Sequence, residues 1–73
     1  MGERRLDVRG LPPCEPLERV LDALESLPRG DVLVVDIHRE PFPLYALLPD
    51  LGCVANTTPQ PDGTFVVRIT RRS

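Results

Sequence analysis

The sequence has no surplus of positive charge and no long apolar run. Its 9 basic residues are all arginine, and with 11 acidic residues they give a formal net charge of -2. Binding to nucleic acid through phosphate neutralisation needs a clustered basic surplus, so this class of function is disfavoured. No apolar run approaches the roughly 18 residues of a membrane span. No membrane association is therefore expected.

Cysteine and histidine are also scarce, with two cysteines and one histidine in 73 residues. A zinc site usually needs three or four ligands, and beyond one cysteine and the histidine only carboxylates are at hand, so no metal is expected. No cofactor is expected either. Residues 1–5 include three charged side chains and are not followed by the apolar core of a signal peptide. We therefore expect the protein to be cytoplasmic, with its thiols reduced. The length favours one domain, residues 1–73, and the 41% of hydrophobic and 27% of charged residues are typical of a soluble globule.

The first half of the chain predicts a strand, a loop and a helix. Residues 5–9 alternate between polar and apolar, which indicates a half-buried strand that ends at Gly10. Prolines in residues 11–16 predict an extended loop, and Pro16 suits the first turn of a helix. Apolar residues then recur every three or four positions and predict one buried helical stripe: Leu17, Val20, Leu21, Leu24 and Leu27.

The second half predicts three more strands and a second helix. Residues 31–37 are apolar or β-branched almost throughout and predict a central strand. Pro43 can begin a helix, and Pro49 is expected to kink or shorten it. Residues 53–57 and 64–70 predict two strands joined by a turn. The leucines of the second helix are expected to face the core: Leu44, Leu47, Leu48 and Leu51.

The order β-α-β-α-β-β predicts an α+β fold, a two-layer α/β sandwich with two helices on one face of a four-stranded mixed sheet. The expected buried residues are Leu17, Val20, Leu21, Leu24, Leu33, Val35, Leu44, Leu47, Phe65, Val67 and Ile69. The other face is expected to be open. It would expose Val32, Val34 and Val66, which makes it a candidate surface for a partner or a second copy.

Three stretches resemble the TusA and SirA sulfur-carrier superfamily, and within it the relatives known as a domain of unknown function. They are Leu6-Asp7-Val8-Arg9-Gly10-Leu11, Cys14-Glu15-Pro16 and His38-Arg39-Glu40-Pro41-Phe42-Pro43-Leu44-Tyr45. The resemblance covers nearly the whole chain. It implies the strand order 1-2-4-3, with strand 4 antiparallel to the others, and at most a sulfur carrier or transferase activity on Cys14. In the carriers the cysteine lies three residues before the helix-opening proline. Here Pro13 holds that place and Cys14 follows it.

The position of Cys14 suits a reactive thiol. The positive end of the helix dipole and Arg9 would both favour the thiolate, whereas Glu15 and Glu18 would oppose it. The alternative is a partly buried cysteine that packs as a small hydrophobe. Cys53, at the start of a strand, is expected to be buried in that way.

His38 follows the second strand as Cys14 follows the first, so both fall at the same edge of the sheet. Ligands tend to bind at this edge in open α/β sheets. The candidate site therefore combines Cys14 as the catalytic residue with Arg9, His38, Arg39 and Glu40 as binding residues. Cys14 and His38 could act as nucleophile and base or as two metal ligands. His38 could also be a loop residue that bonds to its neighbours.

Two functional hypotheses follow. In the first, the protein is a sulfur carrier or an accessory of a sulfur relay, with a persulfide on Cys14 and a protein donor or acceptor as its partner. In the second, it is a non-catalytic module that binds another protein in redox or respiratory metabolism. The expected assembly is a monomer or a weak homodimer.

Overall fold

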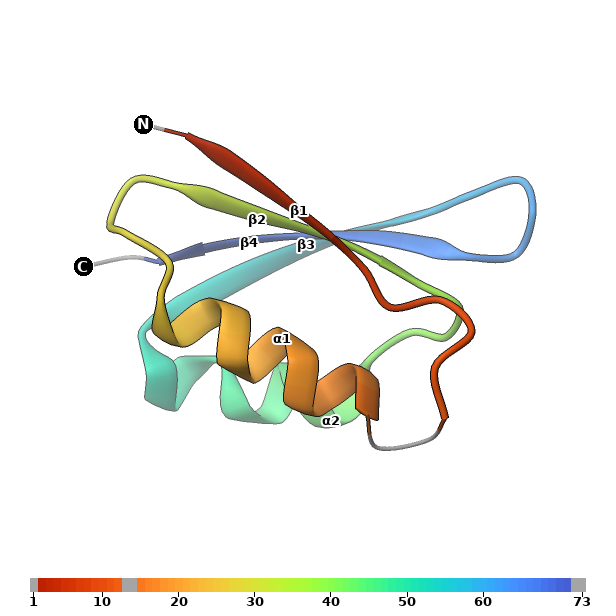
Figure 1. The fold of residues 1–73 in the computed structure, drawn as a ribbon, viewed down its shortest axis with the longest axis horizontal. Coiled ribbons are helices and arrows are strands. Elements are labelled where there is room, and N and C mark those ends of the chain that lie inside the picture. The colour runs from red at the N-terminus through yellow and green to blue at the C-terminus, as the bar shows by residue number, and fades with distance from the viewer. Residues whose placement is uncertain (1, 13–14, 72–73) are drawn as a thin grey trace.

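The computed structural model describes residues 2–12 and 15–71. No helix in these two ranges is long and apolar enough to cross a membrane. The elements, shown in Figure 1, are β1 (Glu3–Asp7), α1 (Glu15–Glu25), β2 (Val32–Ile37), α2 (Phe42–Leu47), a short 3-10 helix η1 (Pro49–Leu51), β3 (Cys53–Pro59) and β4 (Phe65–Arg71).

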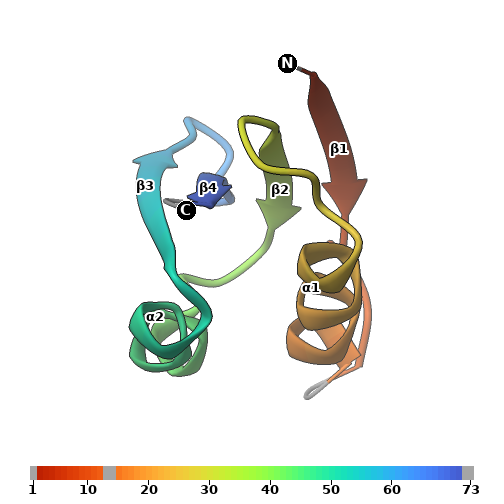
Figure 2. The same ribbon diagram turned by 90° about the vertical axis from the view of Figure 1, so that its left-hand side faces the viewer.

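The sheet confirms the predicted topology. Its strand order is β1-β2-β4-β3, with β1 parallel to β2, and with β4 antiparallel to both β2 and β3. Both helices lie on one face of the sheet, as the two views in Figures 1 and 2 show. The α+β two-layer sandwich is therefore confirmed, and the carboxyl ends of β1 and β2 lie at the same edge.

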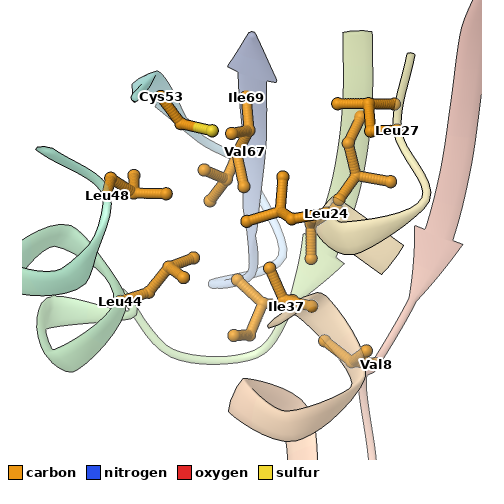
Figure 3. Close-up of a cluster of buried hydrophobic side chains, with 12 residues drawn as sticks. Val8, Leu24, Leu27, Ile37, Leu44, Leu48, Cys53, Val67 and Ile69 are labelled. Carbon is orange, nitrogen blue, oxygen red and sulfur yellow. The ribbon is translucent and has the colours of Figure 1, made fainter. Parts of the chain in front are cut away.

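The core lies between the sheet and the two helices. Figure 3 shows its side chains converging from α1, α2 and the three strands β2, β3 and β4. The predicted residues Leu17, Leu21 and Phe65 are only partly buried and pack against this cluster. The predicted core residues that are buried are Val20, Leu24, Leu33, Val35, Leu44, Val67 and Ile69.

The second helix corrects one part of the predicted core. Leu44 and Leu48 are buried, but Leu47 is 39% exposed and Leu51 is 43% exposed. The helix ends at Leu47 and the chain continues as the 3-10 turn Pro49–Leu51, so Leu51 does not continue the helical stripe. Pro49 causes this break, because it has no N–H to donate to the preceding turn.

The open face of the sheet corrects the predicted apolar surface. Val34 was expected to be exposed there, but none of its surface is accessible. Its register partners are Arg5 on β1 and Arg68 on β4, whose long methylene chains can cover an apolar neighbour. The Arg5 guanidinium also donates from Nε and Nη2 to the carboxylate of Asp36, at 2.9 and 2.8 Å. Val34 therefore adds no apolar surface to this face, and Val32 and Val66, which were also expected there, are half-buried.

An arginine from the last strand stabilises the end of α1. The last turn of α1 has no basic residue, although cations are favourable at the negative end of a helix. Arg71 of β4 fills this place, because its Nη2 donates to the carbonyl oxygen of Leu24 at 2.6 Å. This bond ties the C-terminal end of α1 to the sheet and leaves its N-terminal end beside the carboxyl edge of the strands.

Candidate functional site

A groove of about 510 Å³ lies at the edge of the sheet where β2 ends. One wall is the first part of α1, with Pro16, Leu17 and Val20. The other wall is the loop after β2 and the first turn of α2. Binding sites for small ligands typically have volumes of roughly 300–1,000 Å³, so the groove is large enough for a ligand or a short peptide segment.

The α1 wall is apolar because of how the helix begins. Pro16 stands in the first turn of α1, where its fixed φ is favourable and its missing N–H costs nothing. Pro16 and Val20 are buried and Leu17 is half-buried. Glu15 in the same turn pairs with Arg19 at 3.6 Å on the helix surface, so its charge is partly balanced.

The opposite wall has a polar rim above an apolar base. Its base is formed by Ile37 and Leu44, and its rim by the segment from His38 to Pro41. His38 and Arg39 are exposed, whereas Glu40 is half-buried. The groove can therefore bury an apolar group while His38 and Arg39 contact polar atoms at its mouth.

A hydrogen-bonded tyrosine holds this loop against the sheet. The hydroxyl of Tyr45 on α2 bonds to the side-chain oxygen of Thr57 on β3 and donates to the carboxylate of Glu40 at 3.3 Å. Burial raises the pKa of Tyr45, and the charge of Glu40 acts in the same direction. The phenol therefore remains a hydrogen-bond donor at neutral pH, and it fixes Glu40 at the rim.

Arg9 does not line the groove but forms a close pair with Asp7. Its Nε and Nη2 donate to the two carboxylate oxygens of Asp7 at 2.9 and 2.8 Å, and its backbone N–H donates at 3.0 Å. Together these bonds lower the pKa of Asp7 to about 2 from an ordinary value of 3.8. The side-chain bonds have the largest effect, and the backbone bond has the next largest. The charge of Arg9 is thus balanced by a carboxylate at the end of β1.

This pair gives a testable pH dependence. The pKa of Asp7 is lower in the folded than in the unfolded chain, so its contribution to stability is present above about pH 4 and is lost toward pH 2. Arg9→Ala should raise the NMR titration midpoint of the Asp7 carboxyl from about 2 toward 3.8, but not fully, because the backbone N–H of residue 9 still donates to this carboxylate. Because the pair is exposed, added salt should weaken the shift. A midpoint that stays near 2 in Arg9→Ala would show that the pair is not its cause.

The structure brings together three of the predicted site residues, His38, Arg39 and Glu40, around one groove. Arg9 lies outside this lining. Cys14 lies outside the described residues, but the chain reaches the groove wall at Pro16, two residues later. Within residues 2–12 and 15–71, no three His, Cys, Asp or Glu side chains are grouped as a metal site.

Two features of the site were not predicted from the sequence. The first is the apolar lining, because Leu17, Val20 and Leu44 were assigned only to the core. Their place in the groove depends on how far apart the helices lie, which periodicity does not specify. The second is the contact between Tyr45 and Thr57, which are 12 positions apart in the chain. The short spacing between Glu40 and Tyr45 in the sequence was a usable signal for their contact. Nothing in the sequence indicated that Tyr45 would also contact Thr57 on β3.

Comparisons with known proteins agree on the fold. A crystal structure of a SirA-like protein from Desulfitobacterium hafniense matches with a TM-score of 0.76 and 21% sequence identity. The match covers 94% of this chain and 95% of that one. No curated protein matches significantly. The model of an uncharacterized conserved protein family, DUF2249, matches residues 5–71. The chain therefore has a SirA-like fold and belongs to the DUF2249 family.

Proposed function

We propose that the protein is a sulfur carrier that holds a persulfide on Cys14 and receives its protein partner at the groove. The observation that carries this proposal is the apolar groove beside the start of α1, with His38 and Arg39 at its rim. Cys14 precedes this helix directly in the sequence. A segment of a donor that binds in the groove would bring its own sulfur close to the start of α1.

The transfer is a thiol exchange without net oxidation. The Cys14 thiolate attacks the terminal sulfur of a persulfide on the donor, and a new sulfur–sulfur bond forms on Cys14. The bond within the donor persulfide breaks, and the donor cysteine leaves as a thiolate that takes up a proton. The same exchange in reverse order passes the sulfur to an acceptor. No other oxidant or reductant is needed.

The rim residues have separate roles in this proposal. His38 is proposed as the general base that accepts the proton of the Cys14 thiol, because an imidazole nitrogen can accept a proton from a neighbouring nucleophile. Arg39 provides a positive charge at the mouth of the groove, which favours thiolates and carboxylates of the partner. Glu40 is held by Tyr45 and acts as a positioning residue for the loop.

The proposal is tested by loading the protein with sulfur. The purified chain is incubated with a cysteine desulfurase and cysteine, and its intact mass is measured without reductant. We expect the mass to increase by one sulfur atom, and to return to the starting value after reduction. An unchanged mass with several desulfurases would contradict the carrier function.

A charge in the groove should impair the transfer. Pro43 lines the groove, is exposed and stands in the first turn of α2, where a carboxylate is compatible with the helix dipole. In Pro43→Glu the partner would bury a carboxylate without a counter-ion, at a cost of about 1–3 kcal/mol. The kcat/KM of loading should therefore fall by a factor of about 5 to 150.

A matched control separates the groove from the general charge of α2. Ala46 is exposed on the same helix and does not line the groove. Ala46→Glu introduces the same charge and should leave kcat/KM unchanged. If both variants lose activity equally, or if neither does, the partner does not bind in the groove.

The second candidate function is a binding module without transfer chemistry. The apolar lining of the groove supports it, because this lining needs no thiol to hold a partner. In that case a partner protein binds with equal affinity to the wild type and to Cys14→Ser, and neither protein acquires sulfur.

A further inference from the structure

The two edges of the sheet differ in charge. The strand order places β1 and β3 at the edges, and Figure 2 shows β3 as the outermost strand on its side. β1 carries four charged residues among five, Glu3, Arg4, Arg5 and Asp7, whereas β3 carries none. Charged side chains are a common protection of an edge strand against pairing with another chain. β3 does not have this protection.

The backbone of β3 offers a short row of free hydrogen-bonding groups. Gln60 N–H donates to the carbonyl oxygen of Thr64 on the β4 side at 2.8 Å. Bonded pairs alternate along an antiparallel ladder, so Thr58, Asn56 and Val54 also bond to β4. The residues between them, Ala55 and Thr57, therefore direct their N–H and C=O groups away from the sheet. Within the described chain, no backbone bond outside the sheet occupies these groups.

The row is limited at both ends. The N–H of Cys53 already donates to the carbonyl oxygen of Leu48 at 3.0 Å. Pro59 has no N–H to donate. The free segment is thus centred on Asn56, with one complete donor and acceptor pair on each side of it.

We propose that this edge pairs with β3 of a second copy of the chain, antiparallel and around a two-fold axis at Asn56. In this register Ala55 of one copy lies opposite Thr57 of the other, and the four residues can exchange four backbone hydrogen bonds. A shift by two residues in either direction places Thr57 opposite Cys53 or Ala55 opposite Pro59. Only the register centred on Asn56 gives a partner to both the N–H and the C=O of Ala55 and of Thr57.

The side chains on the open face are compatible with this pairing. Val54 is 41% exposed and would lie opposite Thr58 of the second copy, which forms a β-branched cross-strand pair. Asn56 would face Asn56, so no like charges meet at the axis. The contact is small, which corresponds to a weak dimer with a Kd in the micromolar to millimolar range.

Substitution of Asn56, which lies on the proposed two-fold axis, by residues of opposite charge tests the proposal. The wild type should show a concentration-dependent dimer in sedimentation equilibrium up to about 1 mM. Asn56→Lys and Asn56→Asp should each be monomeric, because like charges directly opposite each other destabilise a strand pair. An equimolar mixture of the two variants should restore the dimer. Circular dichroism of each variant checks its fold, since residue 56 also faces Arg68 within the chain.

The same two substitutions at Thr58, to Lys and to Asp, are the matched control. Thr58 would lie opposite Val54 and not opposite itself, so mixing Thr58→Lys with Thr58→Asp should give no more dimer than either variant alone. A wild type that stays monomeric throughout the concentration range overturns the proposal. A mixture of the Asn56 variants that associates no better than its components overturns it too.

Discussion

Leu24→Ala is expected to lower the free energy of unfolding by about 2–5 kcal/mol, the range for a buried leucine that leaves a cavity. Leu24 is 2% exposed, and its side chain points from α1 into the centre of the core in Figure 3. The backbone carbonyl of the same residue accepts the bond from Arg71, so α1 is held at this position by two kinds of contact. A domain of this size has little stability to lose, and the variant should be partly unfolded at 37 °C.

Leu47→Ala is the matched control for this prediction. It removes the same atoms from a side chain on α2 that is exposed to solvent. Its cost should be about 0.5 kcal/mol or less, as for most surface substitutions. Urea titration followed by circular dichroism measures both values. Equal costs for the two leucines would contradict the assignment of the core.

Cys14→Ser is expected to abolish sulfur loading completely. A serine hydroxyl is not ionised at neutral pH, and its oxygen cannot form the persulfide. The fold should be unaffected, because serine is a favourable residue at the position directly before a helix, and α1 begins at Glu15. The variant therefore separates the chemistry from the structure. Circular dichroism and the urea midpoint of Cys14→Ser should match those of the wild type.

Cys53→Ala is the control for the second thiol. Cys53 is buried at the start of β3, and its thiol lies 3.6 Å from the carbonyl oxygen of Leu51. A buried thiol is poorly accessible to a donor persulfide. Cys53→Ala should load sulfur at the wild-type rate, with only a modest loss of stability. Loss of loading in Cys53→Ala would indicate that Cys53 takes part in the chemistry, which would contradict its assignment to Cys14.

The sequence predicted the topology because local patterns and chain connectivity were sufficient for it. β2, at Val32–Ile37, is the central strand that was predicted over residues 31–37, and the stripe on α1 does face the sheet. The first strand lies two residues earlier than its alternation indicated, at Glu3–Asp7, because backbone pairing with β2 extends to Val32. Pairing is a property of two strands together, which one stretch of sequence does not contain.

Features that depend on neighbours in space were missed. Val34 has the hydropathy of a docking surface, but two arginines from adjacent strands flank it. Leu47 fits the helical stripe in the sequence, but only Leu44 and Leu48 of that stripe are buried, and Leu47 is exposed. His38, Arg39 and Glu40 were predicted to lie together because they follow one strand, and all three line the groove. The apolar lining of the groove was not predicted, because it depends on the distance between the two helices, which the sequence pattern does not specify.

The location of the acquired sulfur tests the carrier function most directly. After incubation with a cysteine desulfurase and cysteine, persulfides are alkylated and the protein is digested with trypsin. Cleavage at Arg9 and Arg19 isolates residues 10–19 with Cys14, and cleavage at Arg39 and Arg68 isolates residues 40–68 with Cys53. We predict that the alkylated persulfide is found in residues 10–19 alone. Its presence in residues 40–68, or in neither peptide, would contradict the account.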